Sequence, residues 1–165
     1  MAKLLRVEWM KLKGYRTFWV LTTLFLISIV GINYSTYYIK QQATQNNAQV
    51  NVIIGAPFGF PNVWHTVSYL SSFLLFIQGL MIITSVTNEY TYKTTRQNII
   101  DGWSRLQFIH VKIALVVILS VLSTIVVFLT AVLFGSVSSE HFSLLKIEFI
   151  GYYFIQALSY SMVAL

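Results

Sequence analysis

The side chains best suited to catalysis or metal binding lie far apart in this sequence. His65, His110 and His141 fall in three separate segments, so a shared metal site is not expected. The absence of cysteine removes thiolate ligands, disulfides and cysteine nucleophiles. No P-loop, H-E-x-x-H or G-x-S-x-G motif occurs. We therefore expect a chain that is not an enzyme, has no cofactor or metal, and has no P-loop of its own for ATP.

The composition indicates a membrane protein. Hydrophobic residues make up 56% of the 165 residues and charged residues only 10%, with a mean hydropathy of +0.70. A soluble domain carries about 25% charged residues, so an ordinary soluble enzyme and a disordered chain are both excluded. The net charge of +6 sits in short clusters between long uncharged runs. That pattern indicates membrane topology and attraction to the lipid bilayer, and no nucleic-acid partner.

Long uncharged runs define four predicted membrane spans. The first, Thr17–Ile39, has 23 residues and would form a helix about 34 Å long, enough to cross a bilayer. The others are predicted at residues 66–87, 113–135 and 149–165. The predicted fold is an all-α polytopic bundle in which residues 1–165 form a single transmembrane domain. Within this domain, an interfacial helix at residues 1–16 precedes the first span.

The distribution of Lys and Arg predicts the orientation of these spans. Nine of these residues lie before the first span or in the loop at residues 88–112: Lys3, Arg6, Lys11, Lys13, Arg16, Lys93, Arg96, Arg105 and Lys112. The other two, Lys40 and Lys146, lie in the remaining loops. The positive-inside rule then places the N-terminus and the second loop in the cytoplasm. The loops Lys40–His65 and Ser136–Glu148 would face outward.

Two polar side chains, Gln78 and Gln156, fall inside the second and fourth spans. A polar group in hydrocarbon needs a partner. They could line a substrate path, or they could form hydrogen bonds between helices, worth about 0.6 kcal/mol on average in membranes. The second interpretation is favoured by the sequence.

The N-terminal segment predicts an amphipathic helix at the membrane surface. At 100° per residue, Trp9 lies with the leucines on one arc, and basic residues lie opposite. Glu8 breaks the pattern because it falls inside the apolar arc. It could pair locally with Lys11, or it could tie this helix to another cytoplasmic element.

The loop at residues 88–112 carries the most distinctive pattern. Glu89 and Lys93 stand four apart in the order that favours a helical pair, and Asp101-Gly102 indicates a turn. Ser104 could cap a helix that leads into the third span. Three apolar residues, Ile99, Ile100 and Trp103, would be exposed on the cytoplasmic side unless something covers them. They could insert into the lipid headgroups or dock a cytoplasmic partner, and the sequence does not decide between these two interpretations.

These two segments resemble the membrane subunits of type-two ABC exporters, such as bacterial antibiotic and peptide exporters. The N-terminal resemblance lies in Arg6-x-Glu8-Trp9-x-Lys11-Leu12-Lys13. The loop resemblance lies in Glu89, Lys93-Thr94, Ile99-Ile100, Ser104-Arg105 and Lys112. The family often has Pro before the Ser-Arg pair, where this chain has Gly102-Trp103.

The resemblance implies an elbow helix at the N-terminus and a coupling helix in the second loop. A separate ABC ATPase subunit would hold the coupling helix in a groove, and a second permease subunit, identical or different, would complete the transporter. The residues it assigns to coupling are Glu89, Thr94, Ser104 and Arg105, with Ile99, Ile100 and Trp103 as the packing face. It also implies a bacterial cytoplasmic membrane location.

The expected function is therefore ATP-coupled efflux of a small molecule, peptide or lipid-like substrate. Permeases of this family usually have six spans, so the four visible spans lead us to expect a truncated chain. An alternative is a non-transporting membrane protein that serves in immunity or assembly and uses the loop to bind a partner.

Overall fold

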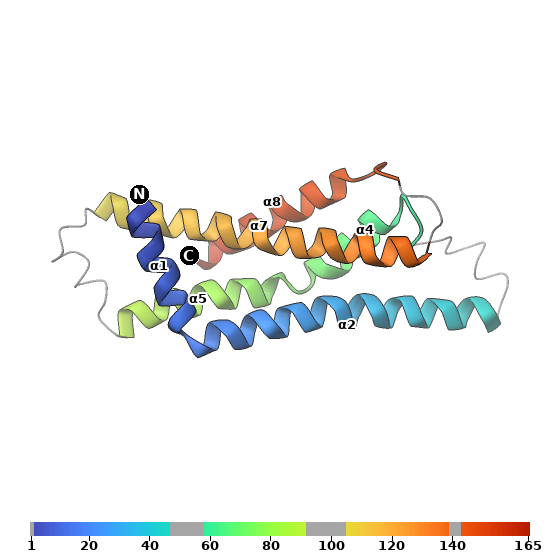
Figure 1. Cartoon of the computed structure of the whole chain (residues 1–165), viewed down its shortest axis with the longest axis horizontal. Coiled ribbons are helices and arrows are strands. Elements are labelled where there is room, and N and C mark those ends of the chain that lie inside the picture. Colours follow the sequence, from blue (N-terminus) through green and yellow to red (C-terminus); the bar gives the residue numbers. More distant parts are fainter. Residues whose placement is uncertain (1, 47–57, 92–104, 139–142) are drawn as a thin grey trace.

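The computed structural model describes residues 2–46, 58–91, 105–138 and 143–165. This part of the chain contains six helices and no strand: α1 (Ala2–Gly14), α2 (Arg16–Asn46), α4 (Val63–Ser72), α5 (Leu75–Thr91), α7 (Arg105–Ser138) and α8 (Glu148–Ala164). The predicted all-α membrane fold is confirmed. Figure 1 shows α2, α7 and the α4–α5 pair running along the long axis, with α1 crossing one end.

The predicted first and third spans lie within longer helices. The second is a bent pair, because α4 and α5 meet at an angle of 44°. At the bend, Leu74 donates to the carbonyl of Ser71 in the short i, i+3 pattern, and the Ser72 hydroxyl donates to the carbonyl of Tyr69. Such serine contacts compete with the helical backbone pattern and favour kinks.

The number of spans is lower than the four predicted. In the described residues, two helices are long and apolar enough to cross a membrane, and the bent pair makes a third if it counts as one span. The fourth prediction corresponds to α8, which has 17 residues. A helix of that length covers about 26 Å, slightly less than the hydrocarbon core.

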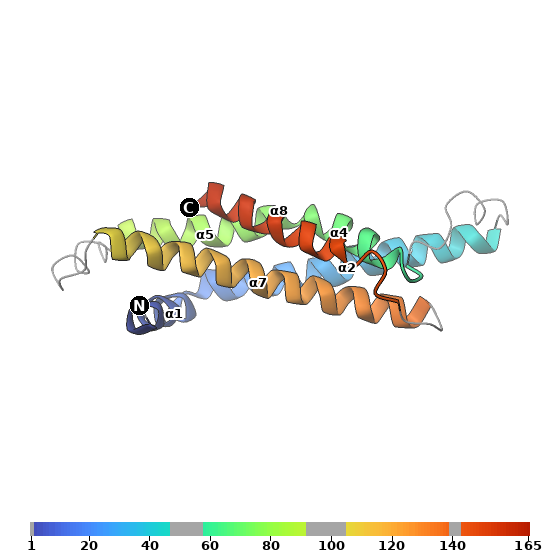
Figure 2. The same cartoon turned by 90° about the horizontal axis from the view of Figure 1, so that it is seen from above.

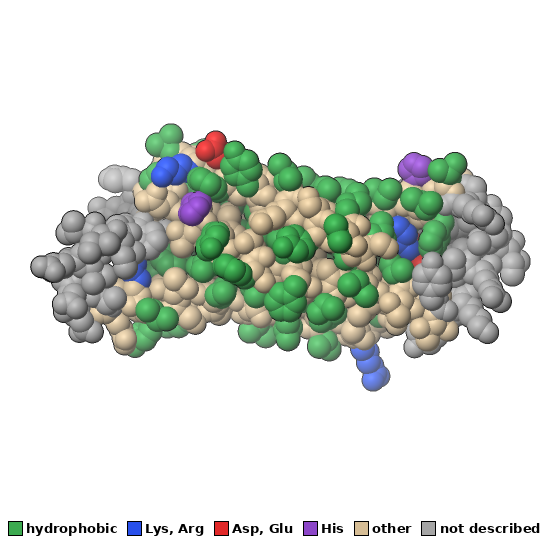
Figure 3. Space-filling view, turned by 180° about the vertical axis from the view of Figure 1, so that it is seen from behind, with side chains coloured by type: hydrophobic (Ala, Val, Ile, Leu, Met, Phe, Trp, Pro, Cys, Tyr) green, Lys and Arg blue, Asp and Glu red, His purple; other side chains and the backbone are tan. Residues whose placement is uncertain are grey.

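Apolar side chains divide between the interior and the outer surface. One buried cluster surrounds Trp64 in the half of the bundle away from α1, and another surrounds Leu12 of α1. Many large apolar side chains of α2 point outward, among them Val20 and Ile27. Figure 3 shows hydrophobic side chains spread over the middle of this face among other side chains and backbone, as expected for a surface that meets lipid. Figure 2 shows α8 beside α5 and α4 on the far side of the bundle from α1.

Candidate functional site

A buried ion-pair cluster joins three helices at the end of the bundle that carries α1. The Nζ atom of Lys112, in α7, lies 2.7 Å from Oε2 of Glu8 in α1 and 2.6 Å from Oε1 of Glu89 in α5. Glu8, Glu89 and Lys112 are 1%, 2% and 4% exposed. Charged hydrogen bonds of this length are strong, so the cluster fixes the three helices relative to one another.

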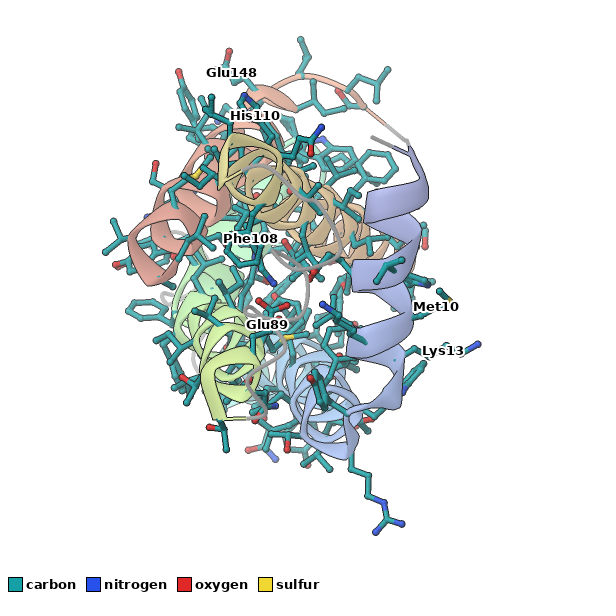
Figure 4. All side chains as sticks on the ribbon, turned by 90° about the vertical axis from the view of Figure 1, so that its left-hand side faces the viewer. Met10, Lys13, Glu89, Phe108, His110 and Glu148 are labelled. Carbon is teal, nitrogen blue, oxygen red and sulfur yellow. The ribbon has the colours of Figure 1, made fainter. Side chains whose placement is uncertain are left out.

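Lys11 completes the cluster at its outer edge. Its Nζ atom lies 3.3 Å from Oε1 of Glu8 and 3.7 Å from Oε1 of Glu89, and its side chain is 20% exposed. Two carboxylates therefore face two ammonium groups, and their formal charges cancel. Figure 4 shows Glu89 inside the bundle and Lys13 of α1 reaching away from it.

The charges of the cluster outweigh the effect of burial on Glu8. Burial alone raises the pKa of that carboxyl, but the hydrogen bond and charge of Lys112, together with the charge of Lys11, hold the pKa below its ordinary value. Glu8 is therefore ionised at neutral pH. For Glu89, burial and the neighbouring Glu8 outweigh Lys112 and raise the pKa above its ordinary value.

The local sequence explains how α1 places a carboxylate inside the protein. Glu8 and Leu12 are four residues apart, so they lie on one face of the helix, and both are buried. Leu12 packs with Phe18, Met81 and Leu115 in an apolar layer next to the ion pairs. Glu8 thus lies within the apolar arc because that face of α1 is buried, and its carboxylate meets charged partners there.

The structure places the sequence-predicted site residues in three groups. Glu8, Lys11 and Glu89 come together in the cluster, and Glu8 makes both the local contact with Lys11 and a contact with another element. Trp9 of α1 is partly exposed. Arg105 begins α7, with its side chain outside the described part. The remaining predicted residues also lie outside the described residues: Thr94, Ile99, Ile100, Trp103 and Ser104.

Sequence reasoning missed the central role of Lys112. It counted this lysine as a topology signal at the start of the third span, without assigning it two carboxylate partners. Its Nζ atom also lies 5.5 Å from the centre of the Phe108 ring, a favourable cation–π distance. The available signal was a set of single charges, Glu8, Glu89 and Lys112, each bordering or interrupting an apolar face.

A second polar group lies deeper in the bundle. The amide nitrogen of Gln78 in α5 donates to Ser161 of α8 at 2.8 Å and to Ser120 of α7 at 3.3 Å. These contacts match the interhelical hydrogen bonds predicted for Gln78, whereas Gln156 lies exposed on α8. The Oε1 atom of Gln78 is buried and has no hydrogen-bond partner among the described residues.

The described histidines show no metal-site geometry. His65 packs edge-on against Phe149, and the Nδ1 atom of His110 lies 2.7 Å from the carbonyl oxygen of Leu106. His141 lies outside the described residues. Within the described ranges, no three His, Asp or Glu side chains are grouped so that they could hold a metal ion.

Comparison with known proteins identifies the family. The family model for ABC-2 family transporter proteins matches residues 4–165, which is nearly the whole chain. No curated protein and no solved structure matches it. Membrane subunits of this family are permease components of ABC transporters and are not themselves catalytic. This chain belongs to the ABC-2 transporter family.

Proposed function

We propose that this chain is the permease subunit of an ABC exporter and that the ion-pair cluster transmits force between the ATPase and the spans. The observation that carries the proposal is the position of Glu89 and Lys112. Glu89 lies near the end of α5 and Lys112 near the start of α7, so they lie close to the two ends of the predicted coupling segment, residues 88–112.

The charged hydrogen bond between Glu89 and Lys112 makes the two ends of that segment move together. Because Lys112 also holds Glu8, a displacement of the coupling segment would reach α1 as well as α5 and α7. Buried charged hydrogen bonds resist stretching more than apolar contacts, which suits them to transmit a movement over a short distance. In this proposal the N-terminus and the coupling segment face the cytoplasm, where the ATPase subunit binds.

The partners follow from the family and are part of the proposal. A separate ATPase supplies the energy, since the sequence has no P-loop. A second permease subunit completes the pathway. The transported substrate is a small molecule, peptide or lipid-like compound that moves outward.

The test is affinity purification of the native protein from membranes in mild detergent, followed by identification of its partners and an assay of ATP hydrolysis. We expect a P-loop ATPase to copurify. In an Arg105→Glu variant the ATPase should be lost, or ATP hydrolysis should no longer drive transport, while membrane insertion stays normal because the span pattern is unchanged.

Lys40→Glu is the matched control, because it makes the same change in charge near the end of α2, on the side of the bundle opposite α1. It should keep both the ATPase and transport. A clean chain without any ATPase would contradict the exporter assignment and favour an immunity or assembly role. Normal transport in Arg105→Glu would contradict the coupling role of this loop.

A further inference from the structure

A groove beside the ion-pair cluster has no role in the proposed coupling. It lies under α1, between α2 and α7, with α5 as its floor, and its volume is about 330 Å³. The mouth is formed by exposed apolar residues, Leu26 of α2 and Leu122 of α7, and the floor by buried residues such as Met81 and Leu119. The groove is therefore open toward the lipid side of the bundle.

The walls of the groove present hydrocarbon. Its hydroxyl residues, Thr22 and Ser123, donate to the backbone carbonyls of Phe18 and Ser120 in their own helices. Their hydroxyl protons are thus already used. Along α2 the groove runs from Phe18 to Leu26, a distance of about 12 Å, which approaches the depth of one leaflet in a hydrocarbon core about 30 Å thick.

The rim of the groove under α1 is positively charged and aromatic. Lys13 lines this rim and forms no ion pair with any side chain that the structure describes. Trp9 and Trp19 flank it, and the indole nitrogen of Trp19 donates to the carbonyl of Lys13 at 3.0 Å, which holds both residues at one level. Tryptophan and lysine at the end of an apolar surface are typical of the headgroup layer.

The acidic side chains that the structure describes at this end of the bundle do not neutralise the rim. Glu8 and Glu89 are buried and paired with Lys11 and Lys112. The Lys13 side chain starts from the groove lining and reaches out from the bundle, so this rim complements a molecule with an anionic head and a hydrocarbon tail. We propose that this groove is a binding site for one anionic phospholipid, with an acyl chain between α2 and α7 and the phosphate beside Lys13.

The test uses the purified chain of residues 1–165 in detergent, without any ATPase, so it does not depend on the proposed function. Dioleoyl phosphatidylglycerol and dioleoyl phosphatidylcholine have the same acyl chains and differ in headgroup charge. Native mass spectrometry counts the lipids bound per chain, and a lipid titration of the melting temperature gives an apparent affinity for each.

We expect the wild-type chain to retain one phosphatidylglycerol in preference to phosphatidylcholine. In Lys13→Gln this preference should fall about fivefold, the factor expected for the loss of one lysine near an anionic headgroup. Leu122→Trp should reduce the binding of both lipids, because the larger ring fills the mouth. Its matched control is Leu129→Trp, two turns along α7 and outside the groove lining, which should bind as the wild type does.

All three changes are at exposed positions, with Leu122 44% and Leu129 54% exposed, so the fold should be retained. Equal retention of the two lipids by the wild type would overturn the proposal, as would an unchanged preference in Lys13→Gln or unchanged binding in Leu122→Trp. A dimer that excludes lipid from the groove would show that a second copy is the occupant.

Gln78→Leu separates a lipid tail from a more polar occupant. The Oε1 atom of Gln78, on the groove lining, could accept a hydrogen bond from a ligand with a donor at its inner end. An acyl chain has no such donor, so phosphatidylglycerol binding should be unchanged in this variant. Weaker binding would contradict the acyl-chain assignment.

Discussion

At the α1 end of the bundle, Glu8, Glu89 and Lys112 join three helices through charged hydrogen bonds. At the opposite end, aromatic rings join the helices: Trp64 of α4 stacks on Phe128 of α7 at 5.5 Å, and Phe58 lies 5.7 Å from both Tyr37 of α2 and Phe134 of α7. Aromatic packing tolerates small shifts, whereas a two-sided ion pair holds its partners in one geometry.

The difference indicates which end of the bundle holds its helices in one fixed geometry. The aromatic end supplies burial, and its directional contacts include the hydrogen bond from the Trp64 indole to the carbonyl of Ser143 at 2.9 Å. The charged end lies beside the predicted coupling segment. If that end transmits force, its variants should alter both stability and coupling, while variants of the aromatic end should alter stability alone.

Lys112→Met should have the largest effect, because it removes the closer of the two ammonium groups that face the buried carboxylates. Removal of one member of a buried ion pair costs about 3–5 kcal/mol. Thermal unfolding in detergent measures the loss. The triple variant Glu8→Gln, Glu89→Gln, Lys112→Met should recover much of it, since no buried carboxylate remains. A triple variant as unstable as Lys112→Met would mean that lost packing, and not charge, causes the effect.

Acidification should weaken the same end. The pKa of Glu8 is lowered in the folded protein, so its contribution to stability is complete above its ordinary pKa of 4.5 and is lost as the pH falls through the lowered folded value. The stability of the wild type should therefore fall more steeply below pH 4.5 than that of Glu8→Gln. Unfolding curves across this range measure the difference, and parallel curves would contradict it.

Trp64→Phe should have a smaller effect at the aromatic end. The ring stacking is retained, but the hydrogen bond to Ser143 is lost, which costs about 1 kcal/mol. Unfolding in detergent gives the loss of stability, and a transport assay should show coupling like that of the wild type. Uncoupled transport in this variant would remove the distinction between the two ends.

Gln78→Leu should have the smallest effect on stability. Hydrogen bonds between membrane helices are worth about 0.6 kcal/mol on average, and two serines share this one. The melting temperature and the transport rate are measured together. Transport lost at unchanged stability would place Gln78 in a substrate path, the interpretation that the sequence does not favour.

The sequence predicted the helices better than their ends and the bend between α4 and α5. Thr17–Ile39 and residues 113–135 lie inside α2 and α7, because an apolar run without charge has few alternatives to a helix. The ends of these helices extend past the apolar runs, where hydropathy carries no information. The bend after Ser72 was missed because residues 66–87 contain no proline, and serine kinks depend on hydrogen bonds that a pattern does not reveal.

The candidate site was predictable only in part. Glu8 attracted attention because a carboxylate inside an apolar arc requires a partner, and Glu89 through a local pattern with Lys93. The sequence could not show that residues 8, 89 and 112 meet, because their contacts join positions up to 104 residues apart. That meeting depends on how α1 crosses the bundle (Figure 1), which is a property of tertiary packing.

The balance of charge in the cluster has an electrical consequence. A charge that crosses a membrane potential of 100 mV gains or loses about 2.3 kcal/mol. When both carboxylates are ionised, the formal charges of Glu8, Glu89, Lys11 and Lys112 sum to zero, so a movement that carries all four as one body transfers no charge across the field. A transport step made by this end of the protein should then proceed at the same rate in polarised and depolarised membranes.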